Sequence, residues 1–226
     1  MSRLLQLLGI ELDEVSWREK AASLAGGVVA ILALIGFTEH ALGLTGASAL
    51  IASMGASTVL LFGVPRGALS QPWPVFGGHL CAAVIGVACA KAIGTTELAA
   101  ALAVGLSILA MHQLRCVHPP GGATALVAVL GGPAVTSLGW GFVWHPVLLD
   151  ALILLAVAVA FNGLFPWRRY PAGLRHRAIA ASDTAQVVTH ERVVAAFREI
   201  DSFVDVTEDD LVRLVELLNQ PVGPKP

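Results

Sequence analysis

Charged residues are nearly absent from the long central part of this chain. Between Lys20 and Arg168 there are only six, all near the ends of apolar runs: Glu39, Arg66, Lys91, Glu97, Arg115 and Asp150. Soluble domains usually contain about a quarter charged residues, whereas this chain has 13% charged and 56% hydrophobic residues. Because the apolar runs are long enough to cross a bilayer as helices, the charge distribution predicts an all-α, multi-pass membrane protein.

Six transmembrane segments are expected, at about 21–40, 44–64, 76–93, 98–114, 121–130 and 146–165. The segment 121–130 is short for a crossing unless 132–142 extends it, so a re-entrant half-helix is the alternative. The small residues of 44–64 lie in its first half, which predicts a helix break near Ser53 to Gly55.

Three parts of the chain follow from this pattern: an interfacial helix at 1–20, a transmembrane domain at 21–167 and a small helical cytoplasmic tail at 168–226. A capping box formed by Ser16 and Glu19 is expected to open the first span. The positive-inside rule places Arg66, Arg115 and the Arg168-Arg169 pair in the cytoplasm, and with them both termini, in a bacterial plasma (inner) membrane. The basic stretch 168–177 is expected to touch anionic lipid headgroups.

Two similar units are visible within the transmembrane part. Gly55-Ala56-Ser57, followed by bulky residues and Pro65, resembles Gly122-Ala123-Thr124, followed by bulky residues and Pro133. Each lies within a three-segment unit, so with six crossings the units would insert in opposite orientations. Inverted repeats with short, broken or re-entrant helices are a common transporter plan.

The stretch from His118 to Leu126 is the main candidate for a binding site. Pro119 and Pro120 suit the first turn of a helix, and the glycines after them allow close approach of a ligand. A helix N-terminus with free N–H groups attracts anions. The predicted site therefore contains His118, Pro119, Pro120, Gly121, Gly122, Ala123 and Thr124, with Ser53, Gly55, Ser57 and Thr58 as the facing half from the first unit.

Tight helix–helix packing is the alternative role for these small residues. Arg66, His79 and Arg115 are candidates for an anion funnel or gate, with topology anchoring as the alternative for the two arginines. His118 is able to attract an anion or take up a proton. No metal-ligand spacing is found, and the three cysteines are expected to be small buried hydrophobic residues.

These motifs together resemble the HPP family of integral membrane proteins, named for the triplet seen here as His118-Pro119-Pro120. The resemblance covers about 15–170 and includes 16–20, 51–57, 71–73, 77–79 and 118–126 in the family's order. Plastid and cyanobacterial members are associated with nitrite transport, so the resemblance implies a transporter of small anions.

The expected function is a transporter or channel for a small inorganic monovalent anion, nitrite first. A non-transporting membrane scaffold or sensor that acts through its cytoplasmic tail is the alternative. No catalytic constellation, cofactor motif or nucleic-acid-binding patch is found, so membrane lipids and the anion are the expected partners. The sequence leaves a homo-oligomer open.

Overall fold

The computed structural model describes residues 15–42 and 48–172, which form helices and contain no strand. The described residues from 22 to 172 lie in one compact unit. The predicted interfacial helix and cytoplasmic tail therefore lie mostly outside the described residues. At the start of the first described helix, the backbone N–H of Glu19 donates to Ser16 Oγ at 3.3 Å, as the capping box predicts.

Within the described residues, four helical segments are long and apolar enough to cross a membrane. They are α2 (Trp17–Leu42), α4 (Pro72–Ala92), α5 (Thr96–Gln113) and the stretch formed by η2 (Val143–Leu148), which is kinked at His145, and α8 (Leu149–Gly163). Two apolar helices are shorter, α3 (Ser48–Gly63) and α6 (Pro120–Leu130). The 11 residues of α6 rise about 16 Å, roughly half of a bilayer core of about 30 Å.

The order long, short, long therefore occurs twice along the described chain, as α2–α3–α4 and as α5–α6–α8. The elements between them, η1 (Ala68–Ser70) and α7 (Gly132–Thr136), are short, and the short η3 (Pro166–Arg168) follows α8. Six full crossings and an inverted repeat stay predictions. The expected break near Ser53 to Gly55 is wrong, because α3 is continuous from Ser48 to Gly63. In apolar surroundings an unbroken helix satisfies its own backbone polar groups.

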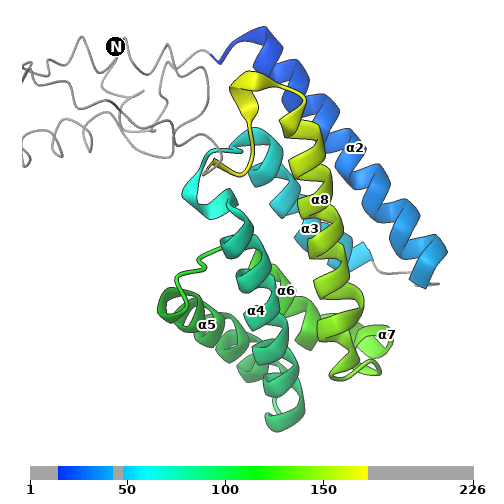
Figure 1. Ribbon diagram of the computed structural model, residues 1–226. Helices are drawn as coiled ribbons and strands as arrows, with labels where there is room; N and C mark the ends of the chain where they lie inside the picture. The colour runs from blue at the N-terminus through cyan, green and yellow to red at the C-terminus, as the bar shows by residue number, and fades with distance from the viewer. Residues whose placement is uncertain (1–14, 43–47, 173–226) are drawn as a thin grey trace, which may run out of the picture. The chain divides into compact units, whose positions relative to one another are not determined.

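Helix α6 lies at the centre of the fold and packs against α3, α4 and α5 (Figure 1). Small residues permit this close packing. A Cβ atom on Gly86 of α4 would lie 2.7 Å from Ala128 Cβ and 2.9 Å from the Ala125 carbonyl oxygen. A Cβ atom on Gly121 of α6 would lie 2.8 Å from the Gly78 carbonyl oxygen. Close helix packing, one of the two roles considered for the small residues, is thus observed at Gly121.

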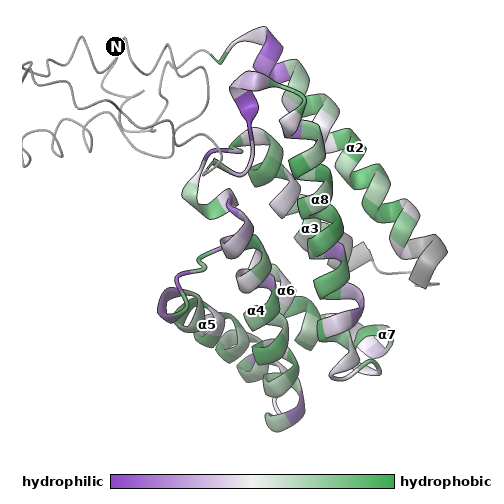
Figure 2. Cartoon of the chain, in the orientation of Figure 1, coloured by the Kyte–Doolittle hydropathy of each residue, from purple (hydrophilic) through white to green (hydrophobic). Residues whose placement is uncertain are grey.

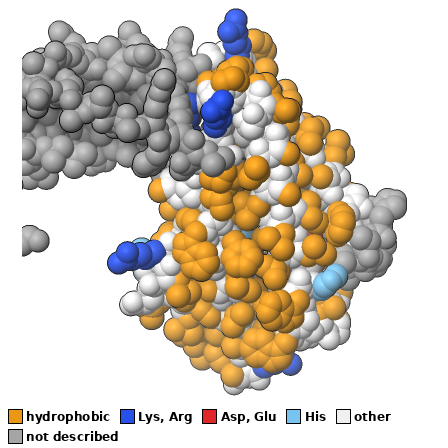
Figure 3. Space-filling model, viewed as in Figure 1, with side chains coloured by type: hydrophobic (Ala, Val, Ile, Leu, Met, Phe, Trp, Pro, Cys, Tyr) orange, Lys and Arg blue, Asp and Glu red, His pale blue; other side chains and the backbone are white. Residues whose placement is uncertain are grey.

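The outer surface of the helices is apolar, as expected of a surface that faces lipid. Leu24, Leu32 and Val59 are 72%, 64% and 69% exposed. Figure 2 shows hydrophilic residues gathered toward helix ends and connections, while the middle of α2 and α8 is hydrophobic. On the face drawn in Figure 3, hydrophobic side chains cover most of the described surface and the visible Lys and Arg side chains lie at its margins.

Arg168 is only 1% exposed and joins the ends of three helices. It donates hydrogen bonds to Asn162 Oδ1 (3.1 Å), Ser23 Oγ (3.1 Å) and the Phe62 carbonyl oxygen (2.6 Å). The expected contact of 168–177 with lipid headgroups is therefore wrong for Arg168, because the carbonyls at the end of α3 need a donor there. Its neighbour Arg169 is exposed.

Tyr170 links the segment after α8 to the connection between α3 and α4 by a hydrogen bond. Its hydroxyl donates to the Ser70 carbonyl oxygen at 2.8 Å, and the side chain is 1% exposed. Burial raises the pKa of the Tyr170 phenol above its ordinary value, so the hydroxyl keeps its hydrogen and remains a donor.

Candidate functional site

Five polar side chains meet in the interior of the helical unit and form what we call the hydroxyl–histidine network. The members come from α3, from α4, from the loop before α6 and from α6 itself: Ser53, Ser57, His79, His118 and Thr124. Each is at most 1% exposed. Buried polar groups are stable only when they are hydrogen-bonded, and here they bond mainly to one another.

Ser57 stands between the two histidines. Its Oγ atom lies 2.8 Å from Nε2 of His79 and 2.8 Å from Nε2 of His118. The two imidazole rings are arranged edge to face, with centroids 5.0 Å apart and an interplanar angle of 65°. On the other side of its ring, His79 Nδ1 lies 2.8 Å from Thr124 Oγ1. The two hydroxyls that occupy matching places in the proposed repeat, Ser57 and Thr124, thus hold opposite nitrogens of one imidazole.

Backbone carbonyl oxygens close both ends of the network. Thr124 Oγ1 lies 2.6 Å from Ser53 Oγ, which donates to the Pro120 carbonyl oxygen at 3.1 Å. At the opposite end, His118 Nδ1 lies 2.9 Å from the Leu69 carbonyl oxygen. Because a carbonyl oxygen only accepts, His118 carries a hydrogen on Nδ1.

Glycines on α4 allow the loop before α6 to approach His79. A Cβ atom on Gly78 would lie 2.6 Å from His118 Cβ, and one on Gly77 would lie 3.0 Å from Cys116 Cβ. The prolines that follow His118 then begin α6, with Pro120 as its first residue. The combination of Gly77-Gly78 and the Pro-Pro pair is therefore what brings the two histidines together.

The backbone N–H groups predicted to face an anion are partly used inside the protein. Gly121 N–H donates to the His118 carbonyl oxygen at 2.9 Å, and Gly122 N–H donates to the Pro119 carbonyl oxygen at 3.0 Å. These bonds form the first turn of α6. An anion at the network would therefore be bound by its hydroxyl and imidazole groups, in exchange for one of their present partners, rather than by these two N–H groups.

Other predicted site residues lie away from the network. Gly55 is half-buried, and a Cβ atom there would meet nothing within 4 Å. Thr58 Oγ1 donates to the Met54 carbonyl oxygen of its own helix at 2.9 Å. Pro119 is exposed and Ala123 is half-buried.

Of the three residues predicted to form a funnel or gate, two lie away from the network and one belongs to it. Arg66 donates a hydrogen bond to the Trp167 carbonyl oxygen, and Arg115 is exposed with a left-handed backbone, φ 54°. His79 instead lies at the centre of the network. The sequence gives little sign of this central position, because His79 stands alone in an apolar run and only the Gly77-Gly78 pair marks it.

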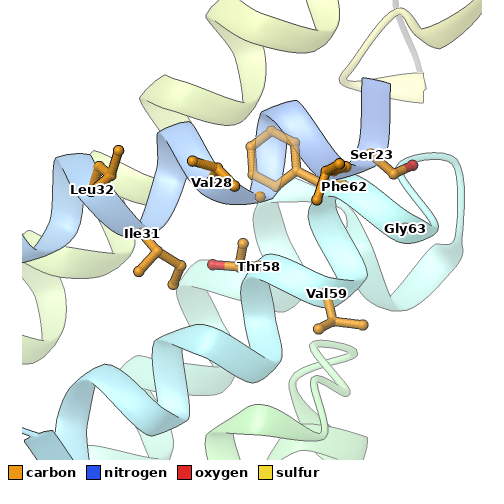
Figure 4. Close-up of a pocket in the computed structure, with 10 residues that line it drawn as sticks. Ser23, Val28, Ile31, Leu32, Thr58, Val59, Phe62 and Gly63 are labelled. Carbon is orange, nitrogen blue, oxygen red and sulfur yellow. The ribbon is translucent and has the colours of Figure 1, made fainter. Parts of the chain in front are cut away.

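A separate pocket of about 580 Å³ lies between α2 and α3 (Figure 4). Its lining is largely apolar and includes Val28, Ile31, Val59 and Phe62, with Thr58 as one of few polar side chains. None of the five network residues lines it. Since exposed leucines such as Leu24 and Leu32 also line it, this pocket suits a hydrocarbon chain better than an inorganic ion.

A second buried polar pair joins α2 to α8. Thr38 Oγ1 donates to Asp150 Oδ1 at 3.0 Å, and both residues are at most 1% exposed. The second carboxyl oxygen, Asp150 Oδ2, has no hydrogen-bond partner among the described residues.

Comparison with known proteins identifies the family. The family model described as HPP, transmembrane region, matches residues 12–171. The chain belongs to the HPP family. Together with the four apolar spans, this membership makes it a multi-pass membrane protein.

This HPP chain is also similar to two transmembrane proteins of Dictyostelium discoideum. One is 41% identical over 165 residues, which cover 71% of this chain and 56% of the relative. The other is 39% identical over 126 residues, which cover 54% of this chain and 40% of the relative. The match thus spans about half the length of these curated relatives. No solved structure matches the chain.

Proposed function

We propose that this HPP protein transports a small inorganic monovalent anion, with nitrite as the first candidate, by way of the hydroxyl–histidine network. The observation that carries the proposal is the burial of five hydrogen-bonding side chains where two short helices, α3 and α6, meet among longer ones. Short or interrupted helices that meet near the bilayer midplane are a common plan of transporter binding sites.

The chemistry of the network favours an anion over a cation. Hydroxyl and imidazole groups are able to donate hydrogen bonds, and no network member is a carboxylate. The N-terminal end of α6 adds a partial positive charge, which contributes about 0.3–2 kcal/mol to binding of a nearby anion. Such weak binding suits transport, because a transported ion must also leave. Nitrite itself enters the proposal through the resemblance to nitrite-associated members of the family.

The arginines support the proposed orientation in a bacterial plasma membrane. Arg66 bonds to the Trp167 carbonyl, one residue before Arg168. Trp73 Nε1, near the start of α4, donates to the Leu114 carbonyl oxygen at 3.0 Å, next to Arg115. These contacts gather Arg66, Arg115 and Arg168 toward one side of the helical unit, which the positive-inside rule assigns to the cytoplasm.

Uptake by liposomes that contain the purified protein tests this proposal. Nitrite, nitrate, chloride and formate are offered in turn, and protein-free liposomes give the background. We expect nitrite uptake above background, and about tenfold slower uptake by Thr124→Val, which keeps the side-chain shape but removes a network hydroxyl. Thr136→Val is the matched control, because the Thr136 hydroxyl bonds to the Gly132 carbonyl at an exposed position. Background uptake of all four anions by the wild-type protein would contradict the proposal.

A further inference from the structure

The hydrogen-bond network lacks one hydrogen when all its members are neutral. It is a chain of six contacts that runs from the Leu69 carbonyl oxygen to the Pro120 carbonyl oxygen. Each hydroxyl and each neutral imidazole supplies one hydrogen, and carbonyl oxygens supply none. Three hydroxyls and two imidazoles therefore offer five hydrogens to six contacts. In the neutral network one contact must bring two acceptors together.

One added proton completes the chain. With the proton on His118, its two N–H groups donate to Leu69 and Ser57, and Ser57 donates to His79. His79 Nδ1–H then donates to Thr124, Thr124 donates to Ser53, and Ser53 donates to the Pro120 carbonyl oxygen. With the proton on His79, its two N–H groups donate to Ser57 and Thr124, and Ser57 donates to His118. Both arrangements fill all six contacts.

The two arrangements differ only around Ser57. When Ser57 accepts a proton from one imidazole and passes its own hydroxyl hydrogen to the other, the charge moves between the rings. The Ser57 Oγ–Nε2 distances of 2.8 Å on both sides are hydrogen-bond distances already, so no heavy atom has to move. A second proton is disfavoured, because two imidazolium rings would then lie 5.0 Å apart with like charges.

We propose that the hydroxyl–histidine network binds one proton together with the transported anion, which makes the protein a proton–anion symporter. This inference rests on the proposed function. A buried cation without a counter-charge is unfavourable, so the proton needs the anion, which takes the place of one acceptor in the filled chain and receives that hydrogen bond. By linkage the anion binds more tightly when the proton is present. The proton comes from water on the side where the anion enters, and both leave on the other side, so each cycle moves no net charge.

No other titratable or charged group among the described residues is placed to hold the added proton in the network instead of the two histidines. Helices α3 and α6 and the turn η1 contain none. Arg115, His112, Glu97 and His145 of η2 are exposed, Asp150 bonds to Thr38, and Tyr170 donates to Ser70. On α4 and in the loop before α6, the remaining groups outside the network are Cys81, Cys89, Lys91 and Cys116. None of these four is hydrogen-bonded to a network member among the described residues.

Initial rates of nitrite uptake into proteoliposomes test whether a proton is transported with nitrite. The rate in protein-free liposomes is subtracted, because nitrous acid itself crosses the lipid bilayer. For the wild-type protein we expect a rise of about tenfold for each pH unit by which the outside is made more acidic, as for an unsaturated co-substrate. A potassium–valinomycin potential of either sign should leave the rate unchanged, because the cycle is electroneutral. Uptake driven by an inside-positive potential and indifferent to the pH gradient would overturn the symport proposal and leave anion transport intact. Uptake at background under every gradient would overturn both.

Variants of the network distinguish a loss of proton transfer between the two histidines from a loss of folded protein. Ser57→Ala and His118→Gln should lose the pH-gradient response, and Ser57→Thr, which restores a hydroxyl, should regain it. Ser107→Ala is the matched control, because Ser107 is also buried in a helix but bonds to the Ala103 carbonyl of its own helix at 2.6 Å. A pH-gradient response of wild-type size in His118→Gln would overturn the proposal.

Discussion

The imidazole rings of His79 and His118 lie edge to face with their centroids 5.0 Å apart, although the two residues are carried by different segments of the chain. His79 lies within α4, and His118 precedes α6. Their proximity depends on Gly78, where a Cβ atom would lie 2.6 Å from His118 Cβ. The pairing is thus produced by helix packing, and the consequences of that packing can be measured.

The α4–α6 crossing should tolerate no added methyl group at Gly86. In Gly86→Ala the new Cβ atom would lie 2.7–3.1 Å from Ala128 Cβ and from the backbone of Ala125, so the helices must move apart. We expect a loss of about 1–3 kcal/mol in the free energy of unfolding, measured by thermal or denaturant unfolding in detergent. The matched control is Gly105→Ala on α5, where nothing lies within 4 Å and a gain of up to about 1 kcal/mol is expected. Equal stability of the two variants would contradict the packing described.

Gly121 and Gly122 are neighbours with different surroundings. Alanine should therefore destabilise the protein at Gly121, which is tightly packed, and not at Gly122, which has free space beside it. A Cβ atom on Gly121 would lie 2.5 Å from Met111 Cε and 2.8 Å from the Gly78 carbonyl oxygen. On Gly122 the nearest atom, Val104 Cγ1, is 4.0 Å away. We expect Gly121→Ala to lower the unfolding free energy by about 1–3 kcal/mol, and Gly122→Ala to leave it unchanged or slightly raised. The unfolding midpoints of both variants in the same detergent check this, and a reversed order would contradict it.

Arg168 should be essential for stability, whereas Arg169 should not be. In Arg168→Met the buried groups of Asn162, Ser23 and Phe62 lose a donor. Each buried acceptor that is left without its donor costs about 1–3 kcal/mol, so we expect a loss of at least that size in the free energy of unfolding. Arg169→Met changes an exposed side chain, so we expect little change. Unfolding in detergent and the yield of monodisperse protein measure the difference, and a stable Arg168→Met protein would show that the arginine is dispensable.

The buried Thr38–Asp150 pair should contribute to the packing of α2 on α8. Thr38→Val keeps the side-chain volume but leaves Asp150 Oδ1 without its donor. The expected loss is about 1–3 kcal/mol of unfolding free energy. A double-mutant cycle with Asp150→Leu checks the cause. If the hydrogen bond is responsible, Thr38→Val should cost clearly less once residue 150 is apolar, and an unchanged cost would assign the effect to Thr38 alone.

The positions of the helices were largely predictable from the sequence. The predicted span 76–93 begins four residues after the observed start of α4 at Pro72, and the predicted segment 121–130 matches α6 to within one residue. Since lipid cannot satisfy backbone polar groups, an apolar run of this length has little choice but to be helical. The same reasoning failed at Ser53 to Gly55, where small residues suggested a break but the helix continues. Close helix packing also requires small residues, so composition alone does not distinguish a helix break from a tightly packed helix.

The sequence by itself determined the membrane class, the family motifs and most members of the candidate site, because hydropathy and proline placement are local properties of the chain. Only the tertiary structure decided how those members are used. It placed His79 at the centre, directed the Gly121 and Gly122 N–H groups into the first turn of α6, and buried Arg168. Hydrogen-bond partners that are 22 to 71 residues apart in the chain depend on how the helices cross, and no local pattern encodes that geometry.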